Sequence, residues 1–181
     1  KDYSLYEKKI REKFYSKTKE GDIGIHQLIN SIKKILDNEF IFDNQLRPTK
    51  AKIYPILVVH DRSFSVLGLN NILNNWFDDE LQKLKNSGYC IERIRSLVLI
   101  DFDTLIYFSQ ELKLPKNVFH EILNDYLKRI DRSKLGKKGE VDNFQKLLNI
   151  NIPFSNYVYK KLRSRSIEPI NLIKDLKKYL Q

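Results

Sequence analysis

Three charged residues near the middle of the chain have the types and spacing of a metal-dependent hydrolytic site. Asp101 ends an apolar run, and Glu111-Leu-Lys113 follows ten residues later. Carboxylates hold magnesium in such sites, and a lysine can orient the attacking water. If the segment forms strands, Asp101, Glu111 and Lys113 are the candidate catalytic residues. The alternative is that residues 104–112 form a helix opened by Asp103, in which these charges are structural.

The same stretch, Leu97-Val-Leu-Ile-Asp-Phe-Asp103, superficially resembles the opening motif of haloacid-dehalogenase-like phosphatases. In that family the two aspartates are nucleophile and general acid beside magnesium. Leu105 departs from the family's pattern, which has threonine or valine there, and no later acidic motif in the C-terminal region completes a metal site. The simpler interpretation is that aspartates at a strand end cap the next helix.

Two polar residues, His60 and Asp61, follow the other apolar run and are candidate supporting residues of a site. Polar groups at the carboxyl ends of parallel strands line the crevice where open α/β sheets bind ligands. The histidines do not have zinc-like spacing. Cys90 is the only cysteine, so there is no disulfide framework, and we expect a cytoplasmic location.

The charge of the chain favours a polyanionic partner. Lysine and arginine outnumber aspartate and glutamate by 33 to 23, for a net charge of +10. AT-rich coding could also produce such a composition. The apolar runs are too short to span a membrane, so no membrane partner is expected.

Two basic clusters are candidate nucleic-acid contacts, because phosphates bind cations and bases stack on aromatic rings. The alternative is that they are solvated helical faces. The first cluster lies in a glycine-containing loop, and the second lies beside Tyr157 and Tyr159. The residues are Lys134, Lys137, Lys138, Lys160, Lys161, Arg163 and Arg165.

The periodicity of apolar residues predicts a mixed α/β fold. Helical spacing is found over 2–17, 25–36, 69–84, 104–112 and 115–130, and buried strands are expected at 52–59 and 96–100. Gly88 is expected to mark the end of the third of these helices. The order strand, helix, strand predicts a parallel pair, and apolar residues at successive positions predict coverage of both faces. We therefore expect a strand-helix-strand core of a mainly parallel sheet in residues 1–114, followed by an all-helical basic tail in 115–181.

Three segments follow one another in an order found in a known superfamily. They are Gly24-Ile-His-Gln-Leu-Ile-Asn-Ser31, Lys52-Ile-Tyr-Pro-Ile-Leu-Val-Val59 and Ser96-Leu-Val-Leu-Ile-Asp-Phe-Asp-Thr-Leu-Ile106. This order resembles the second half of PD-(D/E)xK, or restriction-endonuclease-like, nucleases. By this resemblance Gln27 would be the glutamine that supports the active site.

The signature that defines that superfamily is not found ahead of Gly24. Glu7-Lys8-Lys9 has the spacing, but it lies in a predicted helix without an apolar strand before it. The resemblance therefore implies that the catalytic half is absent from this chain, degenerate, or supplied by another polypeptide.

Two functions follow as expectations. The first is a metal-dependent nuclease, or an inactive relative, that acts on DNA or RNA in a setting such as phage defence and uses Mg²⁺ if it is catalytic. The alternative is a non-catalytic module that binds nucleic acid or assembles with a protein partner.

Overall fold

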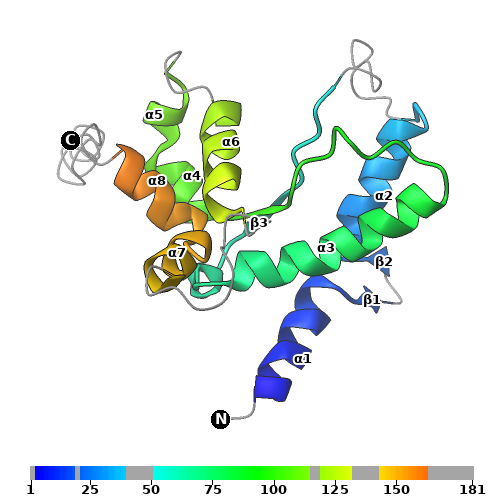
Figure 1. Cartoon of the computed structure of the whole chain (residues 1–181), viewed down its shortest axis with the longest axis horizontal. Coiled ribbons are helices and arrows are strands. Elements are labelled where there is room, and N and C mark those ends of the chain that lie inside the picture. Colours follow the sequence, from blue (N-terminus) through cyan, green and yellow to red (C-terminus); the bar gives the residue numbers. More distant parts are fainter. Residues whose placement is uncertain (1–2, 19–20, 40–50, 115–118, 132–142, 163–181) are drawn as a thin grey trace, which may run out of the picture.

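The computed structural model describes residues 3–18, 21–39, 51–114, 119–131 and 143–162, and Figure 1 shows their arrangement. Helices predominate, and a small parallel sheet lies between them, so the fold is mixed α/β. The elements are α1 (Tyr3–Phe14), β1 (Lys17–Thr18), β2 (Gly21–Asp22), α2 (Ile25–Leu36), β3 (Ile56–Val59), a 3₁₀ turn (Arg62–Phe64), α3 (Leu69–Asn86), β4 (Val98–Asp101), α4 (Phe102–Tyr107), α5 (Ser109–Leu112), α6 (Phe119–Ile130), α7 (Asn143–Ile150) and α8 (Phe154–Leu162).

The central sheet is the predicted parallel pair. Strands β3 and β4 run side by side with Ile56 opposite Val98 and Val59 opposite Asp101. Helix α3 connects them, as the strand-helix-strand pattern predicts. Upstream of Pro55 the pairing is reduced to an isolated bridge at Ile53, because proline lacks the N–H that a continuous ladder needs.

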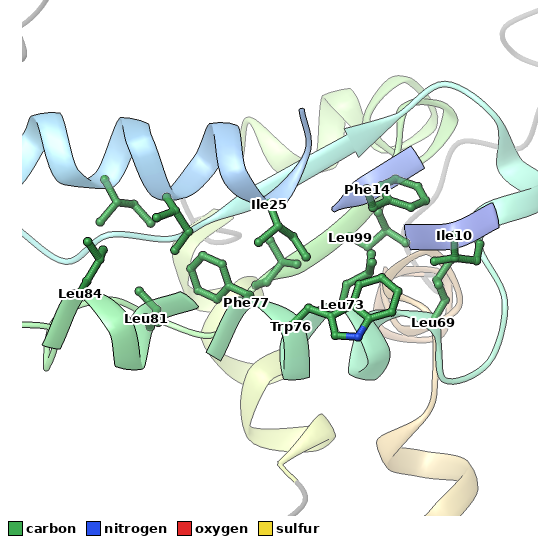
Figure 2. Close-up of a cluster of buried hydrophobic side chains, with 13 residues drawn as sticks. Ile10, Phe14, Ile25, Leu69, Leu73, Trp76, Phe77, Leu81, Leu84 and Leu99 are labelled. Atoms are coloured by element: carbon green, nitrogen blue, oxygen red, sulfur yellow. The ribbon is translucent and has the colours of Figure 1, made fainter. Parts of the chain in front are cut away.

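The two faces of this sheet carry separate apolar cores. Leu97 and Leu99 belong to a core with α1, α2 and α3, which Figure 2 shows around Phe77 and Trp76. Val98 and Ile100 belong to a second core with α6 and α8. Figure 1 accordingly shows α1–α3 on one side of β3 and α4–α8 on the other. Because side chains alternate between the two faces of β4, this strand packs against α1, α2 and α3 on one face and against α6 and α8 on the other.

The expectation that both strands are covered on both faces holds for β4 and is wrong for β3. Every residue of β4 is buried, whereas Val58 of β3 is 52 % exposed. Val58 and Ile56 point to the same face, because side chains alternate along a strand. Ile56 packs against the α6–α8 core, whereas Val58 belongs to neither of the two apolar cores.

Asparagines of α3 take the place of a neighbouring strand along β4. Asn74 donates to the carbonyl of Leu97 at 2.9 Å and accepts from its N–H at 2.7 Å. Asn70 donates to the same carbonyl at 3.1 Å and accepts from the Leu99 N–H at 2.6 Å. The N–H of Val98 points the other way, to Pro55 of the β3 segment. Side-chain amides thus close the edge of β4 that faces away from β3.

Two glycines set the limits of the helices. Gly24 precedes α2 at a φ of 57°, and a Cβ there would lie 2.3 Å from the carbonyl oxygen of Phe14, so only glycine fits between α1 and α2. Gly88 follows α3 at a φ of 92°, where the N–H of Tyr89 bonds back to the carbonyl of Leu84. The predicted end of this helix is therefore confirmed as a left-handed glycine terminus.

Within the described ranges no helix combines the length and the apolar character needed to cross a bilayer.

The asparagine contacts make a stability prediction. Asn74→Ala leaves the buried N–H of Leu97 without its acceptor, and an unsatisfied buried group costs about 1–3 kcal/mol. Chemical denaturation should therefore show a loss of about 2 kcal/mol in the free energy of unfolding. Asn86→Ala, at the exposed end of the same helix, is the matched control and should change it by less than about 0.5 kcal/mol. Equal effects of the two changes would contradict the role of Asn74.

Candidate functional site

Asp101 lies at the carboxyl end of β4 and is 3 % exposed. Its Oδ1 accepts from the backbone N–H of Thr104 at 2.9 Å, which makes Asp101 the N-cap of α4. The hydroxyl of Thr104 lies 2.9 Å from both carboxylate oxygens, and Ser65 donates to Oδ2 at 2.8 Å. Both oxygens therefore already accept hydrogen bonds from the protein.

The same contacts determine the pKa of Asp101. Burial acts to raise it, because a desolvated carboxylate is disfavoured. The hydrogen bonds from Ser65 and Thr104 act in the opposite direction and prevail, so the pKa lies below its usual value. Asp101 is thus held as a carboxylate by groups that also fix the turn from β4 into α4.

Of the two interpretations of Glu111 and Lys113, the one that places them on a strand is wrong. Glu111 is buried in helix α5, and Lys113 is the exposed residue at its C-terminus. The physical reason is the cap: because Asp101 satisfies the N–H of Thr104, the chain becomes helical directly after β4. The helical alternative is confirmed, with the correction that Asp101 and not Asp103 opens the helix.

His60 and Asp61 lie where predicted, at the carboxyl end of β3. The ring of His60 stacks on Phe102 with centroids 6.3 Å apart, which brings the ends of β3 and β4 together. Asp61 accepts from the backbone N–H of Ser63 at 2.8 Å and caps the 3₁₀ turn. This backbone hydrogen bond is the main cause of a lowered pKa of Asp61. Both side chains are exposed, so this end of the sheet carries a solvent-facing imidazole and carboxylate.

Gln27 does not join these residues. It lies on an exposed position of α2, whose neighbours Ile25 and Ile29 point into the core with α3. None of the contacts described for Gln27 reaches the ends of β3 or β4; its backbone carbonyl accepts from Ser31.

The basic residues of α8 are only partly available. Lys161 pairs with the carboxylate of Asp125 on α6 and donates to the hydroxyl of Tyr157 at 3.3 Å. Tyr157 is buried, whereas Lys160 is exposed and Tyr159 is 49 % exposed. Lys160 and Tyr159 are therefore exposed, and the exposed Lys161 is engaged by Asp125. The remaining predicted cations, Lys134, Lys137, Lys138, Arg163 and Arg165, lie outside the described residues.

A polar pocket at the opposite end of β4 was not predicted. It has a volume of about 480 Å³ and lies between α3, the residues that lead into β4, and the C-terminal part of α6. Arg95 and Asp78 line it, and neither stands in a recognisable motif. The sequence signal was the asparagine-rich face of α3, with Asn71, Asn74 and Asn75 in the pocket wall.

The donor set at the strand ends does not fit a magnesium ion. Magnesium prefers several oxygen ligands, and the oxygens of Asp101, the one aspartate that is buried among the described residues, are engaged by Ser65 and Thr104. In the part of the chain that the structure describes, no three histidine, cysteine, aspartate or glutamate side chains are grouped to hold a metal.

Comparisons with models of protein families, with curated proteins and with solved structures give no match to this chain.

The capping role of Asp101 predicts how stability depends on pH. The pKa of Asp101 is lowered in the folded state. Its contribution to the free energy of unfolding is therefore present above the pKa of the unfolded chain, about 3.9, and is lost as the pH falls below that value. Asp101→Asn should lower the free energy of unfolding at pH 7 by about 1–2 kcal/mol, in the range of lost helix caps. As the pH falls from about 5 to about 3, the free energy of unfolding of this variant should also decrease less than that of the wild type.

Asp103→Asn is the matched control, since Asp103 is exposed in the first turn of α4. Denaturation series at several pH values measure both variants. If the free energy of unfolding of Asp101→Asn decreases with falling pH as steeply as that of the wild type, the account is contradicted.

Proposed function

We propose that this chain is the later part of a nucleic-acid-handling α/β domain of the restriction-endonuclease-like type, whose remaining strands pair with the free edge of β3. The observation that carries the proposal is the asymmetry of the sheet. One edge of β4 is closed by Asn70 and Asn74, so the sheet can extend only beyond β3.

The geometry of β3 supports this direction of growth. The Val98 N–H bonds to Pro55, and backbone groups alternate along a strand, so Leu57 and Val59 also face β4. The N–H and C=O groups of Ile56 and Val58 then face the other edge. In the described residues β4 is the only strand that pairs with β3. A four-residue edge without a charge or a proline offers an unprotected template for another strand.

The reaction implied by this class is phosphodiester hydrolysis. Because the described residues do not fit a magnesium site, the carboxylates that such chemistry needs would come with the added strands. The contribution of this chain would be the scaffold: β4, the capped turn at Asp101, and the exposed His60 and Asp61 at the end of β3.

The second candidate function is a non-catalytic module that binds nucleic acid or assembles with a protein. The observation that favours it is that both carboxylate oxygens of Asp101 already accept hydrogen bonds from Ser65 and Thr104, which hold the fold. The net charge of +10 supports nucleic-acid contact equally for both candidates.

Nuclease assays of the full-length natural polypeptide beside this chain separate the two. Labelled DNA and RNA are incubated with magnesium or with a chelator. The nuclease proposal expects magnesium-dependent cleavage by the longer polypeptide and none by this chain. Binding without cleavage by both proteins would replace it with the non-catalytic module.

A substitution on the free edge tests the strand pairing itself. Val58→Pro removes an N–H that we assign to the open edge, so it should leave the melting temperature of this chain within a few degrees. In the full-length polypeptide it should abolish cleavage, because the added strand loses a ladder hydrogen bond. Val58→Thr keeps the N–H and is the control. Unfolding of this chain by Val58→Pro would show that the edge is already in use.

Salt dependence tests the nucleic-acid contact of α8. The affinity of a protein for duplex DNA falls with salt with a slope of about 0.9 per neutralised phosphate. Lys160→Gln should therefore reduce the slope of log affinity against log salt by about 1. Lys161→Gln should change it less, because Asp125 already neutralises that ammonium group. Identical slopes for the wild type and Lys160→Gln would exclude this helix from the contact.

A further inference from the structure

The outer face of α4 is apolar although it lies at the surface. Phe102 is 44 % exposed, Ile106 is 52 % exposed and Tyr107 is 61 % exposed. Phe102 and Ile106 are four positions apart, so they are neighbours on one side of the helix, and Tyr107 follows directly. The ring of His60, which stacks on Phe102, extends this surface toward β3. A contiguous apolar surface of this kind marks a place where another polypeptide segment binds.

The inner face of the same helix is already in use. Thr104 is buried, Leu105 packs against the second core, and Phe108 is a buried member of that core. The apolar residues of the outer face therefore cannot turn inward without displacing these contacts. Their burial needs a further segment that packs on the outside of α4.

The end of α8 lies close enough to supply such a segment. Helix α8 ends at Leu162, which is 2 % exposed and belongs to the core that contains Phe108 and against which Leu105 packs. Residues 163–181 follow and lie outside the described residues. About seven extended residues span about 23 Å, whereas a helix with its side chains is about 10–12 Å across. The chain can therefore reach the outer face of α4 from the end of α8.

The sequence of residues 163–181 complements that face. Its apolar residues have the spacing of one helical stripe, and polar residues occupy most of the positions between them. Pro169 stands just ahead of the stripe, and proline is favoured at the first position of a helix. The segment has five lysines and arginines against two acidic side chains, and the exposed Asp103 lies next to Phe102 at the start of α4. The stripe consists of Leu172, Ile173, Leu176, Tyr179 and Leu180.

We propose that residues 169–181 bind to the outer face of α4 as an amphipathic helix, with the apolar stripe against Phe102 and Ile106. Burial of the apolar side chains on both surfaces stabilises the contact, because apolar area is removed from water. The linker with Arg163 and Arg165, two of the predicted nucleic-acid contacts, is then held against the described part of the chain. This inference is independent of strand addition at the edge of β3.

Cysteine cross-linking of the whole chain tests the contact. Cys90 is the only cysteine, so Cys90→Ser gives a background without thiols. In that background Ile106→Cys is combined with Leu176→Cys, from the stripe, or with Lys174→Cys, from the polar side. Oxidation at low protein concentration should give a disulfide within one chain for Leu176→Cys and little for Lys174→Cys. Leu5→Cys, from an equally exposed position on α1, replaces Ile106→Cys as the control and should also give little.

Thermal melting separates a packed contact from the chance collision of two thiols. Ile106→Ser and Leu176→Ser should each lower the melting temperature by about 2–4 °C, because each removes apolar contact area. The double variant should lower it by less than the sum, since both substitutions remove the same contact. Leu5→Ser combined with Leu176→Ser is the control pair and should be additive.

The other outcomes overturn the proposal. It fails if the disulfide forms as readily with Lys174→Cys or from Leu5→Cys, or if the melting shifts of Ile106→Ser and Leu176→Ser are additive. Disulfides that form only between two chains would assign the face of α4 to a second copy. The absence of any disulfide with Leu176→Cys would assign that face to a separate partner protein.

Discussion

The hydrogen bonds from Asn70 and Asn74 to β4 are the constraint on which the rest of the structure depends. They satisfy the N–H and C=O of Leu97 and the N–H of Leu99, which are buried and would otherwise have no partner. They fix α3 along one edge of β4, and among the described residues no strand pairs with the far edge of β3. They also build the wall of the pocket that Arg95 and Asp78 share. One face of α3 thus forms both the edge of the sheet and part of the pocket wall.

The two ends of β4 differ in chemistry. At the carboxyl end, Asp101 is saturated by Ser65 and Thr104, so its negative charge serves the turn into α4. At the amino end, the Nε of Arg95 is shut off from solvent without a hydrogen-bond partner among the described residues, whereas Asp78 is exposed. A folded protein normally satisfies its buried polar groups, and the Nε of Arg95 is an exception in the described residues.

Local patterns in the sequence predicted the elements well. The helix over residues 25–36, the glycine terminus after α3 and the parallel strand-helix-strand order are confirmed, because each depends on apolar spacing or on turn chemistry within a few residues. Asp101 was singled out for its position, but its role depends on Ser65, 36 residues away. The asparagine contacts join residues 23 to 29 positions apart, and one sequence contains no signal for such pairing.

Amide hydrogen exchange of this chain, followed by NMR, tests the central claim most directly. If α3 closes one edge of the sheet and β3 offers the other, the amides of Leu97, Leu99 and Leu57 should exchange slowly, and that of Val58 should exchange fast. Asn70→Ala should then release the amide of Leu99 while Leu57 stays protected. Protection of Val58 equal to that of Leu57, or a Leu99 amide unaffected by Asn70→Ala, would contradict the account.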